Sequence, residues 1–228
     1  MKVLMGVLYI VGTVLVYICM KKLYKKVNTP LLVPTATSTC IIVAFLLLMN
    51  VDYPTYMVGG KWIGELLGPA VVALAYPLYR NRHLLLQYVW PIIGGVGIGS
   101  IVGIMSGLIF SIGFKVNNEV IRSLAPKSVT SPVAMDIATL IEGSSSLAAV
   151  YVMVAGITGA MIGPFLLKQL NIHHFISVGT ALGSSSHGIG TAKALELGAE
   201  TAAISSISMT LSAIVTVIVC PLFVQWML

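Results

Sequence analysis

Long apolar runs separated by short polar stretches dominate the chain. They divide it into eight candidate membrane segments at residues 3–20, 31–49, 62–79, 90–114, 120–141, 146–167, 172–197 and 202–227. Because one spanning helix takes about 20 apolar residues, eight spans use roughly 160 residues and leave only short loops. The pattern predicts an all-α, polytopic membrane bundle that forms one domain over residues 1–228.

The composition supports a membrane protein. Charged residues make up 9% of the 228 residues and hydrophobic residues 57%, whereas soluble domains carry roughly 25% charged residues. A separate soluble domain and nucleic-acid recognition are therefore excluded. The net charge of +6 serves as a topology signal, because short loops rich in Lys and Arg stay in the cytoplasm.

Two basic stretches predict the topology. Lys21–Lys26 follows the first apolar run, which we interpret as a retained helix because no small-residue cleavage site follows it. Arg80–His83 is a second basic loop, and residues 50–61 are expected to form a loop as well. We expect both basic loops to be cytoplasmic and the N-terminus to lie outside.

Proline and glycine interrupt three of the eight segments. The predicted breaks lie near Gly68 and Pro69, from Pro126 to Pro132, and from Gly183 to Gly190. Freed backbone groups at membrane depth need a protein-lined or wet cavity, so we expect broken or re-entrant helices. Transporters often consist of two halves whose interrupted helices meet near the bilayer midplane and form the substrate site. A five-residue echo between residues 69–73 and 126–130 is compatible with an inverted repeat, and chance explains it about as well.

The seventh segment holds the densest polar chemistry. Its glycines and hydrogen-bonding side chains suit a small anion, particularly a carboxylate, at a helix N-terminus. Lys193 and Glu196 follow at i, i+3 and are expected to pair. The candidate substrate-binding residues of this segment are Ser184, Ser185, Ser186, His187, Gly188, Gly190, Thr191 and Lys193.

Two basic residues inside segments have competing interpretations. His187 is a substrate ligand or proton relay, a structural residue between helices, or a metal ligand. Lys127, with Ser128, Thr130 and Ser131 beside it, neutralises an anionic substrate, or else snorkels to the interface or pairs with Asp136 or Glu119. Gly68 and Pro69 are expected to shape the backbone of the same site.

Catalysis is not expected. The chain has no G-x-S-x-G elbow and no acidic residue that can be assigned to orient a histidine. The sequence predicts neither a metal site nor a cofactor.

Three motifs carry a family resemblance. Residues 67–79, 124–135 and 186–196 read LGPAVVALAYPLY, LAPKSVTSPVAM and SHGIGTAKALE. On these the chain resembles the LrgB/CidB family of bacterial membrane proteins, which is related to the plastid glycolate/glycerate translocator. Lys193 stands where arginine is common in the family, which removes a bidentate carboxylate ligand. Glu142 stands where a glycine-like residue is expected.

The resemblance implies two functions. One is a transporter of small monocarboxylates of the glycolate, lactate and pyruvate class, with the proton as candidate coupling ion. The alternative is an antiholin-like regulator of murein hydrolase activity and cell lysis that acts with an LrgA-like partner. Both place the chain in the bacterial cytoplasmic membrane. Small-residue faces on the fourth and sixth segments would permit a homodimer.

Overall fold

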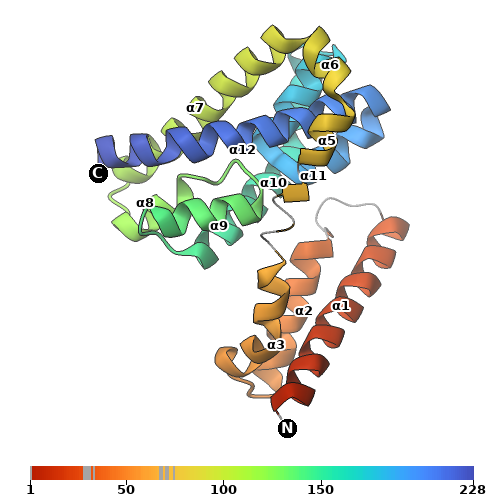
Figure 1. Cartoon of the computed structure of the whole chain (residues 1–228), viewed down its shortest axis with the longest axis vertical. Helices are drawn as coiled ribbons and strands as arrows, with labels where there is room; N and C mark the ends of the chain where they lie inside the picture. Colours follow the sequence, from red (N-terminus) through yellow and green to blue (C-terminus); the bar gives the residue numbers. More distant parts are fainter. Residues whose placement is uncertain (1, 28–31, 33, 67–68, 70–71, 74) are drawn as a thin grey trace. The chain divides into compact units, whose positions relative to one another are not determined.

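The structure, a computed structural model, describes residues 2–27, 32, 34–66, 69, 72–73 and 75–228 (Figure 1). These residues contain helices and turns and no strand, which confirms the all-α prediction. The chain forms two compact units, which we call unit 1 (Met1–Ala70) and unit 2 (Val71–Leu228).

Unit 1 is built from α1 (Lys2–Val27), α2 (Pro34–Leu48) and α3 (Tyr53–Glu65). Helix α1 packs on the other two. Gly6 and Gly59 let α1 and α3 approach closely, since a methyl group added to Gly59 would collide with the Gly6 carbonyl. The rings of Tyr9 and Tyr56 meet edge to face with centroids 5.7 Å apart.

Two loop predictions for the first 65 residues were wrong. Helix α3 covers most of residues 50–61, where proline at an N-terminal position of the helix is tolerated because its missing N–H has no intrahelical partner. Helix α1 continues to Val27, so Lys21–Lys26 forms its last turns rather than a loop. Basic side chains there complement the negative end of the helix dipole.

Unit 2 holds eight helices among its described residues: α5 (Ala75–Arg80), α6 (Arg82–Gln87), α7 (Val89–Gly113), α8 (Asn118–Leu124), α9 (Ser131–Leu140), α10 (Ser145–Gln169), α11 (Phe175–Leu197) and α12 (Ala199–Met227). Arg80–His83 is therefore not a loop. It joins α5 to α6, and the turn is Asn81, whose side-chain amide donates to the Pro77 carbonyl at 2.9 Å.

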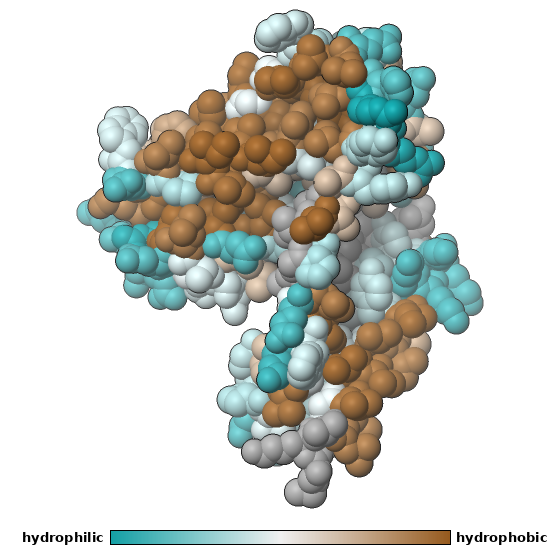
Figure 2. Space-filling model, viewed as in Figure 1, coloured by the Kyte–Doolittle hydropathy of each residue, from teal (hydrophilic) through white to brown (hydrophobic). Residues whose placement is uncertain are grey.

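Four helices are long and apolar enough to cross a membrane in the part of the chain that the structure describes: α1, over Leu4–Val27, and α7, α10 and α12. Aromatic side chains mark both ends of the spans in unit 2. Trp90 lies in the first turn of α7 and is 83% exposed. Phe114 and Trp226 lie at the C-terminal ends of α7 and α12 and are 80% and 77% exposed. Such belts sit at membrane interfaces. Hydrophobic side chains cover the face of unit 2 between its hydrophilic ends (Figure 2).

The fifth predicted segment is a hairpin rather than a span. Helix α8 ends at Leu124 and α9 begins at Ser131, so the break falls in the predicted region. The chain then returns to the start of the hairpin, because Arg122 and Glu142 form an ion pair at 2.5 Å. Ser144 also donates its N–H to Ser123 Oγ at 2.7 Å. We call α8, residues 125–130 and α9 hairpin 1.

The seventh predicted segment is a second hairpin. The helical run of α11 is broken at His187, whose φ of 42° and ψ of −127° are not helical. The chain reverses there. A methyl group on Gly190 would collide with the Leu182 carbonyl, whereas residues eight apart in a straight helix are about 12 Å apart. Val178 and Ala194 accordingly share one core cluster. We call α11 hairpin 2.

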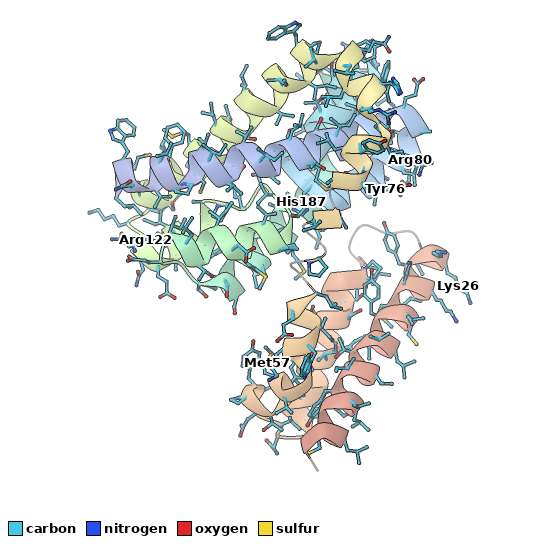
Figure 3. All side chains as sticks on the ribbon, viewed as in Figure 1. Lys26, Met57, Tyr76, Arg80, Arg122 and His187 are labelled. Atoms are coloured by element: carbon cyan, nitrogen blue, oxygen red, sulfur yellow. The ribbon has the colours of Figure 1, made fainter. Side chains whose placement is uncertain are left out.

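The two hairpins enter unit 2 from opposite ends. Hairpin 2 begins at Phe175, whose ring contacts Tyr88 just before α7 with centroids 5.8 Å apart. Hairpin 1 begins where α7 ends. We call these the Tyr88 end and the Arg122 end. Arg80 and Arg122 lie at opposite ends of the unit and His187 lies between them (Figure 3).

Candidate functional site at the hairpin tips

A stripe of glycines on α7 receives both hairpins. The glycines follow one another at i+4, so they lie on one face of the helix. A methyl group on each would touch one hairpin side chain: Thr180 at 2.9 Å from Gly95, Ser184 at 3.2 Å from Gly99, Ser128 at 3.0 Å from Gly103, and Lys127 at 2.7 Å from Gly107. The stripe thus seats hairpin 2 on the first half of α7 and hairpin 1 on the second half.

The tips meet near the middle of the span. Gly99 and Gly103 are about 15 and 21 Å from the start of α7, at 1.5 Å per residue. Residues 175–186 of hairpin 2 are about 18 Å long on the same basis. That length covers only part of a hydrocarbon core of about 30 Å, so the hairpin enters and returns rather than crosses.

A cavity of about 640 Å³ opens between α7 and the hairpins. Four hydroxyls of hairpin 2 and one of hairpin 1 line it, together with α7 glycines and apolar side chains. Its lining residues are Pro91, Gly95, Ile98, Gly99, Val102, Gly103, Ser128, Ile176, Ser177, Thr180, Ala181, Ser184 and Ser185. Three predicted site residues, Ser128, Ser184 and Ser185, are therefore brought together.

Two hydroxyls of this cavity are satisfied by nearby backbone. Ser184 Oγ donates to the Thr180 carbonyl and Ser185 Oγ to the Ala181 carbonyl, both at 2.7 Å. Hydroxyl bonds of this i−4 kind are local and exchangeable. Rotation of the hydroxyl is enough to offer the same proton to a ligand oxygen.

Lys127 lies beside the cavity, at the tip of hairpin 1. Its Nζ donates to the Gly103 carbonyl of α7 at 2.6 Å. It forms no ion pair with Asp136 or Glu119, both of which belong to the described residues. The ammonium is therefore held by a neutral carbonyl and brings an uncompensated positive charge to the hairpin tip.

His187 faces a different helix. Its Nε2 is 3.0 Å from the Val152 carbonyl of α10, and its ring packs on Gly156. The side chain is 4% exposed. Neither His187 nor Lys127 is among the residues that line the cavity.

The other predicted residues take several places. Thr130 precedes α9, and its Oγ1 is buried without a hydrogen-bond partner, while Ser131 is half-buried at the start of α9. Ser186 is buried and its Oγ lies 3.1 Å from Ser185 Oγ. Thr191 Oγ1 donates to the His187 carbonyl and lies 2.9 Å from Ser205 Oγ of α12.

Gly188, Gly190 and Lys193 are not among the residues that line the cavity. Gly188 is exposed and Gly190 is buried at the hairpin turn. Lys193 pairs with Glu196 at 2.6 Å, as predicted from their spacing. Pro69 is exposed, and Gly68 lies outside the described residues.

Sequence reasoning missed Ser177 and Thr180. Both line the cavity, but they precede the glycine-rich run Gly183–Gly190, on which the predicted site was based. The signal was available in the i+4 glycines of α7, since a hairpin seated on that stripe must present one residue per turn to it.

One small-residue face of α7 and one of α10 are covered within the chain. Besides the α7 stripe, the α10 glycines contact hairpin 2: a methyl group on Gly156 would meet His187, one on Gly159 Ser186, and one on Gly163 Leu182. These glycines therefore seat the hairpins. The homodimer that the small-residue faces would permit stays a prediction.

Comparison with known proteins identifies the family of this chain. The profile of the LrgB-like family matches residues 13–226. The chain belongs to the LrgB-like family. This confirms the resemblance drawn from the three motifs, and the two hairpin tips carry two of those motifs.

Relatives match almost from end to end. YxaC of Bacillus subtilis (strain 168) is 47% identical over 96% of this chain and 95% of its own length. A protein of Staphylococcus epidermidis named holin-like protein CidB is 34% identical over 97% of this chain and 96% of its own. CidB of Staphylococcus aureus (strain Mu50) is 33% identical over 96% of each chain. No solved structure matches the chain significantly.

Proposed function

We propose that this LrgB-family protein is a non-enzymatic transporter of small monocarboxylates of the glycolate, lactate and pyruvate class in the bacterial cytoplasmic membrane. The observation that carries the proposal is the meeting of two hairpin tips from opposite ends at the middle of α7, beside a hydroxyl-lined cavity. Broken helices that converge near the midplane are the usual substrate site of secondary transporters.

The chemistry at the tips fits one carboxylate. Ser128, Ser184 and Ser185 offer hydroxyl donors, and Lys127 supplies a cation that a neutral carbonyl holds. The unpaired Thr130 hydroxyl precedes α9, and the N-terminus of a helix favours an anion. An isolated ammonium at membrane depth costs about 3 kcal/mol, and an anionic ligand would offset that cost.

The apolar walls suit a short carbon chain. Ile98, Val102 and Ile176 line the cavity beside the hydroxyls. A ligand with one carboxylate and a small hydroxyl or keto group matches this mixture, whereas a dicarboxylate would need a second cation. Pairing with Glu196 already neutralises Lys193.

A regulator of murein hydrolase activity and lysis is the second candidate, because relatives with 33% and 34% identity carry the name holin-like protein CidB. Such a regulator would work through an LrgA-like membrane partner. It has no need of a cation and hydroxyls at the middle of the span.

Uptake by purified protein in liposomes tests the proposal. We expect saturable uptake of labelled lactate, pyruvate or glycolate that Lys127→Met abolishes, while Lys193→Met retains most of it. Liposomes that take up none of the three acids above the protein-free background would refute transport of this class.

A further inference from the structure

The cavity extends along α7 from the Tyr88 end to the middle of unit 2. On α7 its lining extends from Pro91 to Gly103, and on hairpin 2 from Ile176 to Ser185. Pro91 and Ile176 both lie next to the contact between Tyr88 and Phe175. The cavity therefore starts near the Tyr88 end, passes Ser177 and Thr180, and stops at Ser128.

Hairpin 1 closes the half of unit 2 between the middle of α7 and the Arg122 end. Beyond Gly103, Ile104 and Leu108 of α7 are 1% and 0% exposed, in one core cluster with Ala125 and Val129 of the hairpin tip. Cys220 of α12 belongs to the same cluster and is 0% exposed. The apolar side chains of this cluster thus separate the middle of α7 from the Arg122 end.

The two hairpins are held in different ways. Hairpin 2 makes backbone contact with α12, because methyl groups on Gly179 and Gly183 would collide with the carbonyls of Thr201 and Ser205. His187 ties it to α10 as well. The base of hairpin 1 is tied by the Arg122–Glu142 ion pair and by the bond from Ser144 to Ser123. Its tip packs through apolar side chains, and the polar bond from the tip to α7 is that of Lys127 with Gly103.

From this asymmetry we propose that hairpin 1 is the gate toward the Arg122 end, that the structure holds it closed, and that Ser177 and Thr180 line the substrate path from the Tyr88 end. The inference rests on the proposed function. Lys127 has a second role in it, as the latch that binds the Gly103 carbonyl while the gate is shut. An anion at the tips competes with that carbonyl for the ammonium and so releases the latch.

Gly107 gives a direct way to disturb the latch. A methyl group there would lie 2.7 Å from Lys127 Nζ, so Gly107→Ala must displace the ammonium. Gly113 on the same helix has nothing within 4 Å of such a methyl group, so Gly113→Ala is a matched control. Gly103→Ala is a second variant, since it presses on the Ser128 hydroxyl at 3.0 Å.

Cys220 can report the opening of the gate without an introduced cysteine. In a Cys19→Ala, Cys40→Ala background it is the remaining cysteine of the chain, and it is buried under hairpin 1. We expect a membrane-impermeant maleimide to label it slowly in that background and in Gly113→Ala. Labelling should be at least about tenfold faster in Gly107→Ala, and faster in Gly103→Ala, because opening of the hairpin exposes the thiol.

Ser177→Cys, made in the same background with Cys220→Ala, reports the path. We expect rapid labelling from the side of the membrane that the Tyr88 end faces. The gate is overturned if Cys220 stays equally slow in both glycine variants and the control, and the path is overturned if Ser177→Cys resists labelling from both sides. Liposome uptake separates the two proposals. If the protein takes up the acids but Cys220 is labelled at the same rate in all variants, the gate alone is refuted. If the labelling rates change as expected but no acid is taken up, the transport function alone is refuted.

Discussion

Ser128 of hairpin 1 and Ser184 of hairpin 2 rest on Gly103 and Gly99, which are one helical turn apart on α7. The residues are 56 positions apart in the chain and come from hairpins that enter at opposite ends. Three spanning helices and two such hairpins make up most of unit 2. An odd number of crossings between the hairpins makes them enter from opposite sides, as in transporters with inverted repeats.

Alanine at Gly183 should destabilise the protein strongly. Its methyl group would collide with the Ser205 backbone, and backbone cannot move aside as a side chain can. Overpacking of this kind costs about 1–3 kcal/mol or more. Gly188→Ala is the control, because nothing lies within 4 Å of a methyl group there. Thermal unfolding in detergent measures both, and equal melting temperatures would contradict the close backbone contact between hairpin 2 and α12.

Two substitutions of His187 should differ from each other. A φ of 42° favours glycine, so His187→Gly relieves backbone strain of about 1–3 kcal/mol but loses the bond to Val152. His187→Ala loses the same bond and keeps the strain. We expect His187→Gly to be the more stable of the two. A reversed order of melting temperatures would mean that strain at this residue is negligible.

Glycine at position 142 should be tolerated. Glu142 has a φ of 59°, where glycine is favoured, and its ion pair with Arg122 is exposed at 81% on the Glu142 side. Exposed pairs are worth about 0–1 kcal/mol, similar to the strain that glycine removes. Glu142→Gly should therefore shift the melting temperature little. Arg122→Ala leaves the Glu142 carboxylate unpaired, so its melting temperature should be no higher than that of Glu142→Gly. A large loss in both variants would show that the pair clamps hairpin 1.

The end of α1 should lie in the cytoplasm. Lys21, Lys22, Lys25 and Lys26 form its last turns, and basic residues at a span end are retained inside. Tyr24→Cys, made with Cys19→Ala and Cys40→Ala, should resist an impermeant maleimide in intact cells and react after permeabilisation. Strong labelling in intact cells would reverse the orientation.

The sequence by itself determined the membrane class, the long spans and the positions of the two described breaks. Apolar length fixes a span because hydrocarbon tolerates few polar groups. Pro126 and Pro132 cannot sustain a regular helix, and the run Gly183–Gly190 weakens one. The i, i+3 spacing of Lys193 and Glu196 was enough to predict their ion pair.

Only the tertiary structure decided where the broken segments go. A break allows a helix to kink and continue or to turn back, and the choice depends on which distant surface accepts the tip. Here the α7 glycines accept Thr180, Ser184, Ser128 and Lys127, and the Val152 carbonyl turns His187 toward α10 and away from the cavity. Such long-range contacts join positions without a common local pattern, so hydrophobic periodicity predicts which segments are broken and cannot predict which side chains meet.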